Sequence, residues 1–161
     1  MNNEAGAEVI SEADIQESRE LFLRQAACET AHDISTIESI LVPTVPGRPD
    51  PVNFVARAYR FWGRSAVLDH FRDIFQGTWR FEPDETAIRI LPLGAGAAHI
   101  YAPTRITAGA AGQTPVTRTY LINEFAIRTT GMLTLVFLPT LYVTWFGNKG
   151  PADAPAVSTP P

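Results

Sequence analysis

The sequence predicts a cone-shaped α+β domain in which about three N-terminal helices cover a strongly curved antiparallel sheet. Most of the first 77 residues carry a helical period of apolar side chains, and a run of strands divided by glycine-rich turns follows to residue 146. A chain that groups its helices before its strands is typical of α+β proteins. A length of 161 residues suits one such domain.

The composition excludes several classes of partner. Hydrophobic residues make up 45% and charged residues 19%, as in globular proteins. The net charge of −4 argues against nucleic acid, because neutralising phosphates needs a basic surface. The longest apolar stretch, 132–146, is short for a membrane span and contains Pro139. With no secretory signal at the start of the sequence, we expect a cytoplasmic protein with no membrane partner.

Cofactor and metal patterns are not found in the sequence. The single cysteine, Cys28, excludes an intrachain disulfide and a cysteine-cluster zinc site, and it is predicted to be a small packed hydrophobe. The three histidines are scattered, so we expect no metal. No phosphate loop or dinucleotide-binding motif is present, so we expect no cofactor.

The first helix is predicted to run to about Thr30. Ser11 can cap it, and Asp14 stands three residues later at the spacing of a capping box. A second, short helix begins at Asp33, or alternatively at Ser35 with Glu38 at capping-box spacing.

The second helix ends before the proline- and glycine-rich loop 43–51. A strand is predicted at 52–59, and the third helix at 64–76 with Gly77 closing it. The remaining strands are predicted at 79–81 continuing into 86–91, then at 97–107, 116–128 and 132–145. We therefore predict a folded domain at 11–146, a flexible N-terminus at 1–10 and a disordered tail at 147–161.

A family resemblance rests on three features of the sequence. They are the helix before strand 52–59, the segment Ala31-His32-Asp33 and the helix opening Gly63-Arg64-Ser65-Ala66-Val67. Over about residues 11–146 this order resembles the nuclear transport factor 2-like superfamily, which includes ketosteroid isomerase and the SnoaL-type polyketide cyclases. The resemblance implies an internal hydrophobic pocket. In relatives of ketosteroid isomerase the base is an aspartate on the first strand, but residues 52–62 contain no Asp or Glu here.

Turn positions predict which side chains share a sheet face. If the turn 109–113 centres its hairpin, the outward pairs are Arg105 with Arg118, Tyr101 with Ile122, and His99 with Glu124. The inner face then carries Ile100, Ala102, Thr104, Ile106, Thr117, Thr119, Leu121, Asn123, Phe125 and Ile127, joined by Thr134 and Tyr142. These inner positions hold no acid or base.

The same alternation places Leu133, Leu135, Phe137 and Leu141 on the outer face. An outward apolar patch implies a partner, and we expect a homodimer through this face.

Three functions follow as alternatives. The first and favoured one is the binding of a small apolar molecule, held by Thr119, Asn123, Thr134 and Tyr142 with Tyr59 or Trp62 stacking on it. The second is an isomerase, polyketide cyclase or dehydratase acting on a hydrophobic carbonyl or polycyclic substrate, with His32, Asp33 or His70 as the acid or base. The third is a purely structural dimerisation domain.

Overall fold

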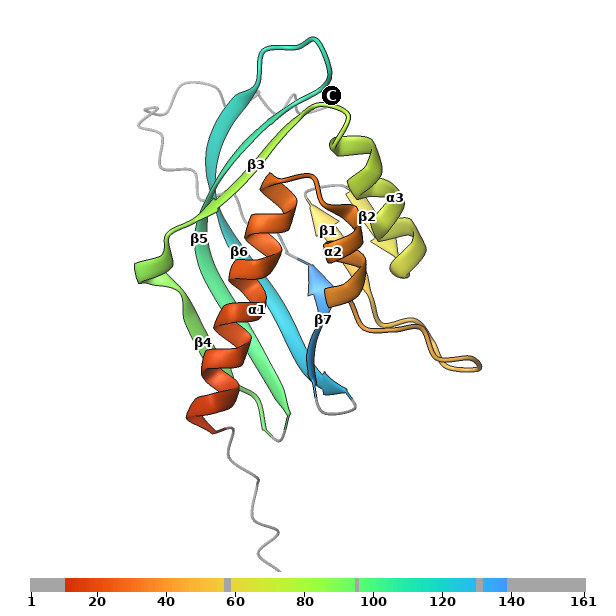
Figure 1. Ribbon diagram of the computed structural model, residues 1–161, viewed down its shortest axis with the longest axis vertical. Helices are drawn as coiled ribbons and strands as arrows, with labels where there is room; N and C mark the ends of the chain where they lie inside the picture. Colours follow the sequence, from red (N-terminus) through yellow and green to blue (C-terminus); the bar gives the residue numbers. More distant parts are fainter. Residues whose placement is uncertain (1–10, 57–58, 95, 130–131, 139–161) are drawn as a thin grey trace, which may run out of the picture.

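The computed structural model describes residues 11–56, 59–94, 96–129 and 132–138. In these residues the helices α1 (Glu12–Thr30), α2 (Ile34–Ile40) and α3 (Arg64–Ile74) lie on one side of a strongly curved sheet (Figure 1). The predicted α+β architecture is therefore confirmed. The predicted flexible N-terminus and disordered tail lie outside the described residues.

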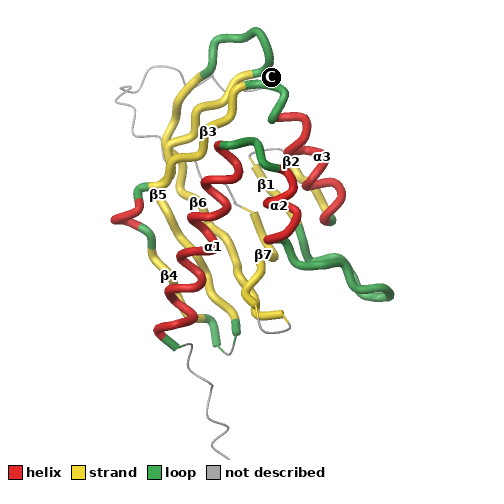
Figure 2. Tube along the Cα trace, viewed as in Figure 1, coloured by secondary structure: helices red, strands yellow, loops and turns green. Residues whose placement is uncertain are grey.

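The sheet is built mainly from long antiparallel strands (Figure 2). Its strands are β1 (Asn53–Ala56), β2 (Tyr59–Trp62), β3 (Thr78–Pro83), β4 (Arg89–Pro92), β5 (Ala97–Gly109), β6 (Val116–Thr129) and β7 (Met132–Leu138). Their order is β2-β1-β7-β6-β5-β3, and β4 also pairs with β5. The β1–β7 pair is parallel, unlike the prediction, because the chain leaving α2 already runs alongside β7 in the same direction, with Leu41 bridging Leu135.

Two strand predictions differ from the structure. The predicted strand 52–59 is divided between β1 and β2, which pair with each other antiparallel. The predicted strand 86–91 begins with a 3-10 turn at Glu85–Ala87, because the Asp84 side chain accepts a hydrogen bond from the Thr86 amide at 3.0 Å and holds the chain in a turn.

The predicted helix caps are confirmed. Ser11 Oγ accepts from the Asp14 amide at 3.2 Å, and the Asp14 carboxylate accepts from the Ser11 amide at 3.0 Å. At α2 the cap is Asp33, the first of the two alternatives, which accepts from the Thr36 amide at 3.1 Å. Cys28 is buried, and burial raises the pKa of its thiol to about 12, as expected of a packed hydrophobe.

The register of the β5–β6 hairpin is one residue away from the prediction. Its innermost described pair is Ala108 with Val116, so the intervening loop is centred on Gly112, which has a φ of 77°. Arg105 therefore opposes Thr119, and a slip of one residue moves every side chain of one strand to the other face. The inner face predicted for β5 is confirmed, with Ile100, Ala102, Thr104 and Ile106 buried.

On β6 the predicted faces are inverted. Ile122, Glu124 and Ala126 are buried, whereas Thr119 and Asn123 lie on the outer face. The predicted outward pair of His99 with Glu124 is wrong, because Glu124 opposes Ile100 instead. Of the positions predicted to face inward, Thr117 and Phe125 are exposed and Leu121 and Ile127 are only partly buried.

The error extends to β7. Thr134 pairs with Ile127, with which it was predicted to share a face, so β7 inherits the inversion of β6 as far as Leu135, after which the register shifts by one residue. Leu133 and Leu135 are consequently buried inside rather than outward, and the predicted dimer patch is wrong at these two positions. The Phe137 side chain and Leu141 lie outside the described part of the chain.

Candidate functional site

A polar cluster of Gln25, Glu29, Trp79 and Glu124 lies in the otherwise apolar space between α1 and the sheet. Gln25 and Glu29 are 1% exposed and Glu124 is 0% exposed. Residues four apart on a helix share a face, so Gln25 and Glu29 point together towards the sheet. Glu124 reaches them from β6, and Trp79 from β3.

Hydrogen bonds join the cluster asymmetrically. Gln25 Nε2 donates to Glu29 Oε1 and to Glu124 Oε1, each at 2.8 Å, and Trp79 Nε1 donates to Glu29 Oε2 at 2.8 Å. Both carboxyl oxygens of Glu29 are therefore satisfied. Glu124 Oε2 and Gln25 Oε1 are buried and have no hydrogen-bond partner among the described residues.

Burial shifts both carboxyl groups towards the neutral form. Removal from water raises the pKa of Glu29 to about 7, against the opposing effect of the Gln25 and Trp79 hydrogen bonds. Burial raises the pKa of Glu124 well above its usual value, the Gln25 hydrogen bond opposes this, and the nearby Glu29 charge raises it further. Among the described residues neither carboxyl forms an ion pair. Glu124 is thus shifted towards its protonated form, and Glu29 is near its midpoint at neutral pH.

Two neighbouring carboxyl groups with different proton affinities form an acid–base pair. The statement that the inner face offers no acid or base is thus wrong, and the one-residue slip of β6 is the reason. The sequence does hold a sign of the helical half of the cluster. Leu21, Gln25 and Cys28 stand at positions i, i+4 and i+7 of one buried helix stripe. Apolar side chains are expected on such a stripe, so the polar Gln25 is unusual there.

His32 and Asp33, two of the three residues predicted as the acid or base, are not part of this cluster. His32, with a φ of 58°, places Nε2 3.1 Å from the Trp79 carbonyl oxygen and stacks on Phe75 at 4.7 Å between ring centroids. Asp33 caps α2, and hydrogen bonds from Ser35 and Thr36 lower the pKa of its carboxyl to about 2. Asp33 therefore acts as the N-cap of α2.

His70 lies in an aromatic group between α3 and the β1–β2 hairpin. Its ring stacks on Phe61 at 4.1 Å and lies 5.0 Å from the Phe54 ring, between centroids. Burial lowers the pKa of this half-buried imidazole, while Asp73 opposes the shift. His70 thus packs against aromatic rings.

The residues predicted to hold a ligand do not meet in one place. Asn123 Oδ1 lies 3.1 Å from His99 Nε2 on the outer face, and Thr134 is buried with its hydroxyl 3.3 Å from the Ile127 carbonyl oxygen. Trp62 ends β2 with 66% of its surface exposed. Tyr142 and the Tyr59 side chain lie outside the described residues.

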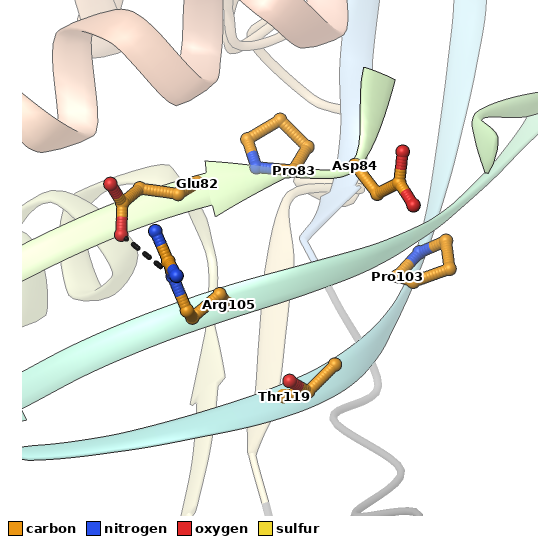
Figure 3. Close-up of a pocket in the computed structure, with 6 residues that line it drawn as sticks. All are labelled: Glu82, Pro83, Asp84, Pro103, Arg105 and Thr119. Atoms are coloured by element: carbon orange, nitrogen blue, oxygen red, sulfur yellow. Dashed lines mark hydrogen bonds and ion pairs between the residues drawn. The ribbon is translucent and has the colours of Figure 1, made fainter. Parts of the chain in front are cut away.

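Thr119 lines a groove of about 350 Å³ on the outer face, with Glu82, Pro83, Asp84, Pro103 and Arg105 (Figure 3). Glu82 and Arg105 point towards each other across it and form an ion pair at 3.2 Å. Asp84 is occupied by Thr86, which donates its backbone amide and its hydroxyl. The charged groups of this groove thus already have partners.

Within the described ranges, no three His, Cys, Asp or Glu side chains gather as metal ligands would. In the same ranges, no helix is long and apolar enough to cross a membrane.

No family model matches the sequence, and no curated protein matches it. Solved structures do match its fold. A proposed dehydratase of the NTF2-like family from Streptomyces avermitilis is 14% identical, with a TM-score of 0.68 over 80% of this chain and 95% of that one. An NTF2-like superfamily protein from Salmonella enterica is 12% identical, with a TM-score of 0.68 over 86% and 95%.

A proposed aromatic ring hydroxylase from Novosphingobium aromaticivorans is 11% identical, with a TM-score of 0.68 over 80% of this chain and 88% of that one. The resemblance to nuclear transport factor 2-like proteins is confirmed at the level of the fold. Because fold does not determine function, the chemistry rests on the site.

Proposed function

We propose that this protein is an acid–base enzyme that acts on a small, largely apolar molecule inside the cone, with Glu124 as the acid and Glu29 as the base. The reaction is of the isomerase, cyclase or dehydratase type. The observation that supports it is a pair of buried carboxyl groups that share one amide donor yet differ in their other contacts. The sequence favoured simple binding because no acid or base was expected inside, and the inward position of Glu124 removes that reason.

The asymmetry of the pair assigns the two roles. Glu29 accepts two hydrogen bonds, which stabilise its ionised form, so it loses its proton at the lower pH and acts as the base. Glu124 accepts one hydrogen bond and keeps its proton, so it acts as the acid. A base near its midpoint at neutral pH combines availability with proton-accepting strength.

A carbonyl substrate illustrates the chemistry. Glu29 takes the proton from the carbon next to the carbonyl, and the electrons of that C–H bond move towards the carbonyl oxygen. Glu124 stabilises the enolate oxygen by donating its hydrogen bond, or transfers the proton to it. Return of the proton from Glu29 to another carbon, together with return to Glu124 of any proton that it gave to the oxygen, completes an isomerisation.

Hydrogen exchange tests the proposal without knowledge of the natural substrate. Cyclohexenone, a decalone and a 3-ketosteroid are incubated with the protein in heavy water, and mass spectrometry measures deuterium next to the carbonyl. We expect exchange with at least one ketone and a loss of about 100-fold or more in Glu29→Gln, since acid–base groups contribute on that order. Glu20→Gln, an exposed position of the same helix, is the matched control and should keep the full rate.

Equal exchange by the wild type and Glu29→Gln would reject the enzyme. If a ketone raises the melting temperature while no compound exchanges, the binding function alone is supported. If no compound binds or exchanges, the structural alternative is favoured.

The homodimer remains a prediction. Exposed apolar side chains on the outer face of the sheet support it. Leu91, His99 and Phe125 stand in one row across β4, β5 and β6, with Leu91 51% and Phe125 39% exposed. Sedimentation at micromolar concentration tests it, because a monomer there would reject the dimer. The cytoplasmic location likewise remains a prediction.

A further inference from the structure

We propose that the interior site recognises a neutral hydroxyl group on an apolar molecule, because Gln25 and Glu124 each keep one buried oxygen that has no hydrogen-bond partner within the described part of the chain. The acceptor is Gln25 Oε1 and the donor is Glu124 Oε2. This deepens the proposed function and rests on its statement that a small molecule enters the interior.

The donor follows from the environment of Glu124. Its carboxyl group is fully buried and, in the described part of the chain, has no cation beside it. An isolated buried carboxylate is costly, so the group keeps a proton. Because Oε1 accepts the Gln25 hydrogen bond at 2.8 Å, the proton is on Oε2.

The acceptor follows from the orientation of the Gln25 amide. Its Nε2 atom lies 2.8 Å from a carboxyl oxygen of Glu29 and 2.8 Å from one of Glu124. A rotated amide would place its oxygen against both, and one of them, on Glu29, belongs to a carboxyl group that is partly ionised at neutral pH. Both N–H groups are therefore used, and Oε1 is left as an acceptor.

A hydroxyl group fits this pair because it accepts and donates at once. Its oxygen accepts from Glu124, and its hydrogen is donated to Gln25. A ketone or an ether accepts only, so Gln25 Oε1 would remain unsatisfied. A carboxylate or phosphate would meet the Glu29 charge without a cation to offset it. The site therefore selects a neutral alcohol or enol over a ketone, an ether or an anion.

Three probes of equal size test this: cyclohexanol, cyclohexanone and methylcyclohexane. Titrations followed by ¹H–¹⁵N NMR monitor the Gln25 side-chain amide and the Trp79 indole N–H, with Trp62→Phe assisting the indole assignment. We expect cyclohexanol to shift both resonances and to bind about tenfold more tightly than the other two, the effect of one additional hydrogen bond. Equal affinities for cyclohexanol and cyclohexanone, or no shift with cyclohexanol, would overturn the proposal.

Variants separate this proposal from catalysis. Glu124→Gln keeps a donor towards the hydroxyl oxygen but cannot act as the acid, so it should keep the preference for cyclohexanol and lose deuterium exchange. Glu124→Met should lose the preference, and Glu20→Gln should keep both properties. A preserved preference in folded Glu124→Met would overturn the proposal. The affinity ratio in the wild type remains decisive if Glu124→Met does not fold.

The two failures are distinguishable. Preference for cyclohexanol without deuterium exchange rejects the enzyme and supports the hydroxyl site. Deuterium exchange with equal affinity for the alcohol and the ketone supports the enzyme and rejects the hydroxyl site.

Discussion

The two ends of α1 both meet β6 through acidic side chains, yet their electrostatics are opposite. Near its start, Asp14 and Glu17 accept hydrogen bonds from Arg128, and Glu17 also accepts from the Leu133 amide at 3.0 Å. Near its end, Glu29 meets Glu124 through Gln25. Arg128 and Glu124 are four residues apart on one strand, so both reach the helix side.

The difference shows what burial does to a carboxyl group when a cation is absent. Hydrogen bonds from the Ser11 amide and hydroxyl lower the pKa of Asp14, and that from the Leu133 amide lowers the pKa of Glu17, with Arg128 adding to both. At the buried end of α1, near Glu29, burial outweighs the hydrogen bonds and raises the pKa of Glu29 and Glu124. One helix thus carries an ionised rim and an interior held largely neutral.

The largest effect on stability is expected from truncation of Glu124, at the buried end of α1. Glu124→Ala removes packed side-chain atoms and leaves a Gln25 N–H unpaired, so we expect a loss of about 4 kcal/mol in the free energy of unfolding. Glu124→Gln should cost about 1 kcal/mol or less, because glutamine is close in shape to glutamic acid and is neutral, as the buried Glu124 carboxyl is expected to be. Denaturation with urea at pH 7 measures both. A similar loss in the two variants would contradict the neutral state of Glu124.

The second prediction concerns the pH dependence of stability. The pKa of Glu29 is about 7 in the folded protein and near 4.5 when unfolded, so its contribution is present below pH 4.5 and lost as pH rises to 7. A shift of this size corresponds to about 3 kcal/mol. Glu124, with its pKa also raised, should continue the decline at higher pH.

Glu29→Gln should flatten the stability profile between pH 4.5 and 7, as measured by urea midpoints. All other ionisable groups are common to the two proteins, so the difference between the profiles reports Glu29 together with its effect on the pKa of Glu124. Parallel profiles would show that folding does not raise the pKa of Glu29.

The sequence predicted well what depends on local geometry. The capping box of α1, the Asp33 cap and the alternation along β5 each follow from residues a few positions apart. The pairing of β5 with β6 depends instead on the chain between Ala108 and Val116, which holds two glycines, Gly109 at the end of β5 and Gly112 in the loop, and the sequence alone does not show which residues form the turn. A one-residue error there inverted the inner faces of both β6 and β7.

The candidate site was beyond sequence reasoning for the same physical cause. Glu124 was placed outside by the register error. Gln25 and Glu29 were not predicted as site residues because whether they face the sheet depends on the rotation of α1 about its own axis. The packing of Leu21 and Phe22 sets that rotation. Neither half of the cluster looks functional without the other half.

The smallest effect is expected at the ionised rim, from Arg128→Met. The methionine keeps much of the apolar stem but leaves Asp14 and Glu17 without their cation. Both carboxyls have lowered pKa values in the folded protein, so their stabilisation is present at neutral pH and is lost as pH falls through those values. The variant should be modestly less stable than the wild type at pH 7, by less at high salt, and nearly equal to it below pH 3. A deficit that is the same at pH 7 and at pH 3 would mean that Arg128 acts through the packing of its stem. The rim would then resemble the interior in depending on packing, and charge would not be what distinguishes the two ends of α1.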